Sequence, residues 1–201
     1  TRLVSDWSSD VCSSDLSNAE LEQMYQEVIL EASKAPHGKQ KFAADITSAD
    51  AEKSDNAVAH ATLSAEHEYC VTAQSHQFNP TCGDEVTVRV ELTNGKNGEP
   101  IRIEKLMWDG QGCSISQASL SIMYDLVAGK TLDEAMELFR TFHKLMESRG
   151  AGLENEEEIE SLDDAIVFQG VSRYPMRIKC ALLGWEGLKD SAAQALTHIN
   201  Q

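Results

Sequence analysis

Apolar and polar residues alternate along two neighbouring stretches in the middle of the chain. The first has its apolar positions at Val86, Val88, Val90 and Leu92, which predicts a half-buried strand. Two Asn-Gly pairs within residues 94–98 then supply a hairpin turn. Alternation resumes at Ile101 and continues to Trp108, through an expected bulge, until the glycine-containing run 109–112 ends the strand. This pattern predicts an antiparallel hairpin.

Helical periodicity surrounds the hairpin. It predicts amphipathic helices over 17–34, 114–127 and 131–149, and a last helix from Pro175 to about residue 196. Capping boxes mark two starts, Ser17 with Glu20 and Thr131 with Glu134. Residues 151–165 contain seven acids and no Lys or Arg, which indicates a solvated loop or an exposed helix start. The fold class expected is α+β.

Two stretches lack a period. Residues 1–17 repeat Ser-Ser-Asp and are interpreted as artefactual adapter or tag sequence, or as a disordered tail. Residues 40–77 are expected to form an irregular insertion of partial order. The remaining chain, 18–201, is expected to be a single domain, since 201 residues suffice for one core.

Charge restricts the classes of partner. The net charge of −16 argues against nucleic acid and anionic membranes, which require a basic face, and favours a protein with a basic docking patch. No window of 18 apolar residues occurs, and five cysteines do not form a secreted disulfide framework. The cytoplasm is therefore the expected location.

Four residues from three stretches are the candidate chemical site: Cys82, Asp84, Cys113 and Cys180. Three thiols and a carboxylate suffice for a tetrahedral zinc ion or for one edge of an iron–sulfur cluster. The predicted hairpin places the residues before its first strand next to those after its second, so Cys82 and Cys113 should lie close together. Cys113 also begins a helix, where free backbone N–H groups and the helix dipole favour a thiolate.

Simpler interpretations exist for each of these residues. A lone buried cysteine is usually a small hydrophobic residue, and an aspartate after glycine is a common cap or turn residue. Arg177 and Lys179 flank Cys180 and are either solvated charges or cations that lower the thiol pKa and attract anionic sulfur species. His76 is a weak candidate for an outer contact of the site.

The stretches NPTCGDEV, GQGCSISQASLS and GVSRYPMRIKCALLGW occur in this order within residues 20–195. Together they resemble the SufU/IscU group of iron–sulfur cluster assembly proteins, related to the NifU N-terminal domain. The resemblance implies a small antiparallel sheet packed against several helices, a metal site at one end, and a cysteine desulfurase that hands over sulfur as a persulfide.

Two features make the resemblance stronger for the SufU branch. Lys179 precedes the last cysteine where scaffold-type members carry histidine, and residues 131–165 look like the insertion typical of SufU. That branch implies zinc held by Cys82, Asp84, Cys113 and Cys180. It also implies a SufS-like desulfurase as donor, further Suf assembly proteins downstream, and a sulfurtransferase-like role in which Cys82 receives the sulfur and Arg177 assists.

Two other functions fit the same residues. One is a scaffold that assembles and transfers a [2Fe–2S] cluster; the other is a structural zinc module without transfer chemistry. Burial of all four ligands would favour the structural module, and a solvent-accessible site would favour transfer. A thiol–disulfide oxidoreductase is disfavoured because no Cys-x-x-Cys occurs.

Overall fold

A four-stranded antiparallel sheet in the order β1-β2-β3-β4 forms one layer of the protein. The computed structural model describes residues 18–41, 62–63, 70–95 and 98–199. The strands are β1 (Thr62–Leu63), β2 (Cys70–Asn79), β3 (Asp84–Thr93) and β4 (Ile103–Gln111). The predicted artefact or tail over 1–17 lies outside the described residues, as does most of 40–69.

The expectation of an irregular insertion over 40–77 is wrong for residues 70–77, which belong to β2. This strand pairs with β3 along its whole length, from Cys70 opposite Thr93 to Asn79 opposite Asp84. Its sequence does not alternate between apolar and polar residues, because the adjacent polar residues Gln74 and Ser75 are both buried. Long-range pairing, and not a local hydrophobic pattern, fixes this strand.

The hairpin of β3 and β4 confirms the predicted alternation. The bulge expected in the second strand is also present, because Leu92 pairs with Ile103 and Glu91 with Lys105, so β4 has one extra residue between them. The strand does not break at 109–112 as expected, since β4 continues to Gln111. Gly110 lies opposite Val86, and a Cβ at Gly110 would stand 2.2 Å from the carbonyl oxygen of Glu85. Glycine therefore permits close pairing here and does not end the strand.

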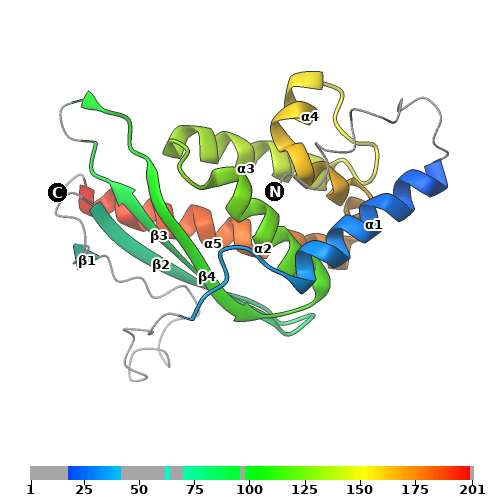
Figure 1. Cartoon of the computed structure of the whole chain (residues 1–201), viewed down its shortest axis with the longest axis horizontal. Helices are drawn as coiled ribbons and strands as arrows, with labels where there is room; N and C mark the ends of the chain where they lie inside the picture. Colours follow the sequence, from blue (N-terminus) through cyan, green and yellow to red (C-terminus); the bar gives the residue numbers. More distant parts are fainter. Residues whose placement is uncertain (1–17, 42–61, 64–69, 96–97, 200–201) are drawn as a thin grey trace.

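Helices cover the sheet and extend beyond it (Figure 1). They are α1 (Asn18–Lys34), α2 (Ser114–Val127), α3 (Leu132–Glu147), α4 (Glu156–Leu162) and α5 (Pro175–Ile199), with short 3-10 turns over 163–169 and 171–173. Helix α5 packs along β2 and β3, where Gly187 lies so close to Val88 that a Cβ would stand 2.8 Å from its Cγ2. Helix α1 packs against α2.

The predicted helix starts are confirmed at two places. Thr131 and Glu134 form the reciprocal capping box that opens α3, and Pro175 is the first residue of α5. The acidic stretch 151–165 contains the short helix α4, whose N-cap side chain is Asn155. The start signal at Ser17 lies outside the described residues.

An aromatic cluster fixes α3 against α5. Phe142 stacks on Trp185 with ring centroids 4.8 Å apart and meets the ring of Phe168 edge-on at 5.6 Å. All three side chains are at most 1% exposed. This contact holds α5 in place and with it the position of Cys180. None of the described helices has the length and apolar character required to cross a bilayer.

Candidate metal centre and thiol cleft

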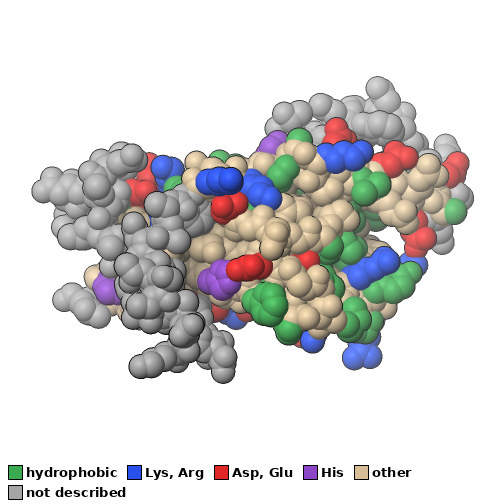
Figure 2. Space-filling model, turned by 90° about the horizontal axis from the view of Figure 1, so that it is seen from below, with side chains coloured by type: hydrophobic (Ala, Val, Ile, Leu, Met, Phe, Trp, Pro, Cys, Tyr) green, Lys and Arg blue, Asp and Glu red, His purple; other side chains and the backbone are tan. Residues whose placement is uncertain are grey.

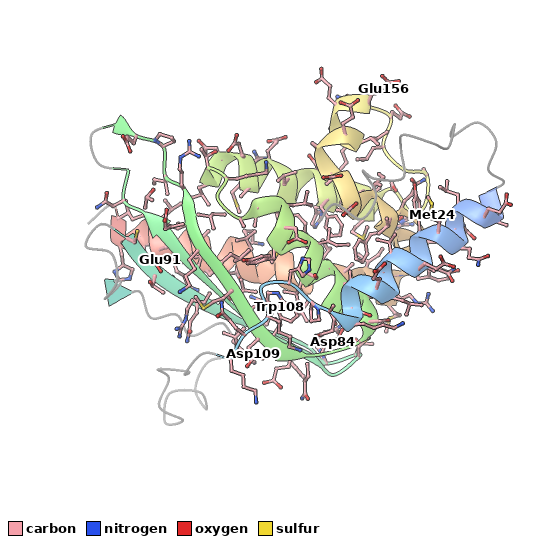
Figure 3. The ribbon with its side chains drawn as sticks, viewed as in Figure 1. Met24, Asp84, Glu91, Trp108, Asp109 and Glu156 are labelled. Carbon is pink, nitrogen blue, oxygen red and sulfur yellow. The ribbon has the colours of Figure 1, made fainter. Side chains whose placement is uncertain are left out.

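Three strand ends meet at one end of the sheet. Asn79 ends β2, Asp84 begins β3, and Gln111 ends β4 opposite Glu85. Figure 3 shows Asp84 at this end of the sheet, whereas Glu91 lies toward the opposite end of β3. The predicted placement of the Cys82 and Cys113 stretches side by side follows directly from this pairing.

The turn 80–83 presents Cys82 at the protein surface. The Asn79 side chain anchors it, because its Oδ1 accepts a hydrogen bond of 3.1 Å from the Thr81 N–H. Gly83 has a φ of +70°, a left-handed conformation that glycine adopts without strain, and its N–H donates to the Asn79 carbonyl at 2.9 Å. Cys82 is exposed, while Asp84, two residues later, is only 1% exposed.

Asp84 links this turn to the start of α2. Its Oδ1 accepts a hydrogen bond of 2.9 Å from the Cys113 backbone N–H, and its Oδ2 lies 3.7 Å from the Cys113 Sγ. Cys113 is the N-cap residue of α2, as predicted. A carboxylate at a helix N-terminus is stabilised by the helix dipole. Gly112 permits the approach, since a Cβ there would stand 2.9 Å from Asp84 Oδ1.

Cys180 completes the group from the second turn of α5. Its Sγ lies 3.2 Å from the Cys82 Sγ, and the Asn79 side-chain amide donates to it at 3.4 Å. The thiol is 1% exposed. Burial, followed by the hydrogen bonds with Asp84 and Cys82, raises the pKa of the Cys180 thiol. A bound divalent cation reverses that preference, because metal coordination deprotonates a thiol.

The ligand atoms fit a single metal ion. One atom each from Cys82, Asp84 and Cys180 lie within 4.8 Å of one another. Ligand atoms bound about 2.3 Å from a tetrahedral zinc ion are about 3.8 Å apart, and the Cys82 and Cys180 sulfurs, 3.2 Å apart, are already close to that separation. Cys113 is not in that group, but its sulfur is 3.7 Å from Asp84. Soft thiolates with one carboxylate are a suitable zinc donor set.

A cleft of about 690 Å³ opens beside these residues, between α1, the start of α2 and the start of α5. Cys82, Cys113 and Cys180 line it, together with Arg177 and apolar side chains of α1 such as Ile29. The face in Figure 2 shows exposed hydrophobic side chains close to Lys and Arg side chains. Because the exposed Cys82 lines a cleft, the site does not have the complete burial expected of a structural zinc module.

Of the other predicted residues, Arg177 lines the thiol cleft, whereas Lys179 and His76 do not. Arg177 is exposed, lines the cleft, and has its guanidinium 4.7 Å from the Tyr174 ring centre. Lys179 is exposed and does not line the cleft. His76 bonds to Thr87 Oγ1 at 3.0 Å and pairs with Glu85, so the structure gives it no contact with the thiols.

Sequence reasoning assigned no role to Asn79, although it contacts both the turn and Cys180. The available signal was an asparagine at the end of a strand, directly before Pro80 and three residues before Cys82. Such a residue commonly caps a turn through its side chain. Its contact with a thiol 101 positions away could not be inferred from that local pattern.

Comparison with known proteins adds independent evidence. The family model of the NifU-like N-terminal domain matches residues 24–181. The zinc-dependent sulfurtransferase SufU of Bacillus subtilis strain 168 is 39% identical over 116 residues, which cover 58% of this chain and 71% of SufU. The iron–sulfur cluster assembly scaffold protein IscU of Streptococcus pyogenes serotype M1 is also 39% identical, over 127 residues, 61% of this chain and 73% of IscU.

A solved structure supports the same relationship. It is that of a protein described as an iron–sulfur cluster assembly scaffold for the SUF system, from Fervidobacterium islandicum AW-1. The two structures superpose with a TM-score of 0.50 at 30% identity, covering 82% of this chain and 93% of that one. The α+β fold expected from the sequence is therefore confirmed.

Proposed function

Since this chain belongs to the NifU-like N-terminal domain family of iron–sulfur cluster assembly proteins, we propose that it is a zinc-dependent sulfur acceptor. Its donor is a cysteine desulfurase of the SufS type, and its sulfur passes to further assembly proteins of the cytoplasm. The observation that carries the proposal is the exposed Cys82 thiol, 3.2 Å from the buried Cys180 thiol, at a cleft that a donor can enter.

The four ligand residues have separate tasks in this proposal. Cys82, Asp84, Cys113 and Cys180 hold zinc, which keeps the thiols as thiolates and protects them from oxidation. Asp84 and Cys113 are tied together by a backbone hydrogen bond, and Cys180 is buried. Cys82 is the only one of the four that is exposed and lies in a turn, so it moves toward a donor at the least structural cost.

The transfer is a thiol–persulfide exchange. The Cys82 thiolate attacks the outer sulfur of the donor persulfide, a new S–S bond forms, and the donor S–S bond breaks. The donor cysteine leaves as a thiolate and takes up a proton, so no external oxidant or reductant is required. The product is a persulfide on Cys82.

Arg177 supplies a positive charge for the persulfide and the leaving thiolate in this exchange. Arg177 lines the same cleft as the three thiols, and its guanidinium is supported by the Tyr174 ring at 4.7 Å. A cation there attracts a negatively charged persulfide and stabilises the leaving thiolate. Lys179 contributes less, because it stands outside the cleft lining.

A cluster scaffold is the second candidate, favoured by the 39% identity to the Streptococcus IscU scaffold protein. The same three thiols and carboxylate could hold a [2Fe–2S] cluster. Lys179 counts against it, since histidine at this position is the residue that scaffold-type members carry. The structural zinc module is the weakest candidate because Cys82 is exposed at a cleft.

A substitution of the acceptor tests the proposal. Zinc-loaded protein is incubated with a cysteine desulfurase and L-cysteine, and persulfides are mapped by alkylation and peptide mass spectrometry. Cys82→Ser should abolish both the persulfide and the stimulation of desulfurase turnover, whereas Cys70→Ser, at a buried position on β2, should preserve both. Undiminished persulfide formation in Cys82→Ser would refute the acceptor assignment.

A further inference from the structure

We propose that Asn79 is a positioning residue that holds Cys180 in the metal site and thereby leaves Cys82 as the thiol that reacts. Two of its hydrogen bonds carry the inference. The side-chain Nδ2 donates to the Cys180 Sγ at 3.4 Å, and the Oδ1 accepts from the Thr81 N–H at 3.1 Å. One amide therefore contacts one thiol directly and supports the turn that carries the other.

Burial makes these contacts consequential. Asn79 is 4% exposed and Cys180 is 1% exposed, so little water competes for the amide or for the sulfur. A hydrogen bond to an ionised acceptor is about twice as strong as one between neutral groups. When Cys180 is a metal-bound thiolate, the Asn79 N–H therefore strengthens its retention in the site.

The amide distinguishes two sulfurs that lie side by side. The Cys82 and Cys180 sulfurs are 3.2 Å apart and line the same cleft, so a donor that reaches the exposed Cys82 also comes close to Cys180. An N–H donor withdraws electron density from the sulfur it contacts and so weakens its attack on an electrophile. The structure records that donor on Cys180, whose thiol also lies 3.8 Å from the Met176 carbonyl oxygen. Cys82, exposed in the turn, remains the reactive partner.

The amide nitrogen and oxygen of Asn79 can be tested separately. Asn79→Asp keeps an oxygen acceptor for the Thr81 N–H but removes the N–H donor to Cys180. The matched control is Gln74→Glu, also an amide-to-carboxylate change at a buried position of β2. Its Oε1 accepts from the Arg89 guanidinium at 2.7 Å, a contact that a carboxylate preserves.

The primary assay does not depend on sulfur transfer. Zinc-loaded protein is treated with limiting iodoacetamide, and the modified cysteines are quantified by peptide mass spectrometry. The wild type and Gln74→Glu should be modified first at Cys82, whereas Asn79→Asp should also be modified at Cys180 and lose zinc affinity by about 10–100-fold. The same order of modification in all three proteins would overturn the inference.

A measurement on the wild type covers the case in which the variant does not fold. In protein loaded with ¹¹³Cd, an N–H···S bond to a metal-bound thiolate produces a scalar coupling between the amide proton and the metal nucleus. We expect that coupling for the Asn79 side-chain amide, and its absence would contradict the inference. The choice between Cys82 and Cys180 as persulfide carrier rests on the proposed function; the alkylation order and the cadmium coupling do not, so the two can fail separately.

Discussion

Gly112→Ala tests how closely the Asp84 carboxylate must approach the start of α2. A Cβ at this position would stand 2.4 Å from the Ser116 Oγ and 2.9 Å from Asp84 Oδ1. Contacts this short force the carboxylate away from the Cys113 N–H, which now donates to it at 2.9 Å. The change therefore acts on a metal ligand without removing any ligand atom.

The magnitude follows from the bond that is lost. A hydrogen bond to a charged group contributes about 1.5–3 kcal/mol, so urea unfolding of the metal-free protein should show a decrease of that size. Misplacing a ligand's support typically lowers metal affinity by about 10–100-fold. Zinc affinity is measured by competition with a chromophoric chelator.

Two further variants make the result specific. Gly170→Ala is the control, because no atom stands within 4 Å of a Cβ at Gly170 and its φ of −63° suits alanine. The double change Gly112→Ala with Ser116→Ala removes the shorter contact and should recover only part of the zinc affinity. If Gly112→Ala binds zinc as tightly as Gly170→Ala, the inferred role of the Asp84–Cys113 bond is wrong.

Four other predictions follow from the structure. Arg177→Gln should slow sulfur acceptance severalfold while the zinc content stays at the wild-type level, and Lys179→Gln should slow it less. Equal rates for Arg177→Gln and the wild type would show that Arg177 has no role in the transfer. Phe142→Ala should cost about 3–5 kcal/mol in urea unfolding, because its ring is fully buried against Trp185; a loss below about 1 kcal/mol would show that this contact does not anchor α5. Thr131→Ala should cost about 0.5–2 kcal/mol by removing the N-cap of α3, measured in the same assay. Hydrogen bonds from the Thr131 side chain and backbone lower the pKa of the Glu134 carboxyl, so the capping box should stabilise the protein above pH 4.5 and lose that contribution as the pH falls below it. Thr131→Ala should flatten this part of the pH–stability profile. An unchanged profile would show that the capping box does not cause the pH dependence.

Local pattern was sufficient for much of the fold. Val86 and Val88 alternate with polar residues and are buried in β3, Thr131 caps α3, and Pro175 opens α5. These features depend on periodicity and on cap chemistry, both of which act within a few residues. The hairpin also predicts that the stretches carrying Cys82 and Cys113 lie side by side, and Asp84, two residues after Cys82, accepts a hydrogen bond from the Cys113 N–H.

Features that depend on long-range contacts could not be predicted. Strand β2 carries polar Gln74 and Ser75 at buried positions, so its sequence shows no clean alternation, and only pairing with β3 identifies it. Gly110 was interpreted as a strand breaker, but the close approach of Glu85 explains it within a continuous strand. The contact of Asn79 with Cys180 depends on the packing of α5 against β2.

Metal content and desulfurase turnover, measured on the same preparation, distinguish a zinc-dependent sulfur acceptor from a cluster scaffold. The protein is purified without added iron, its metals and acid-labile sulfide are quantified, and cysteine desulfurase activity is recorded with and without it. A zinc-dependent sulfur acceptor should be colourless, contain about one zinc per chain, as one tetrahedral site of four ligands implies, and markedly stimulate turnover. Iron with acid-labile sulfide, visible absorbance and no stimulation would contradict it and assign the chain to the scaffold class.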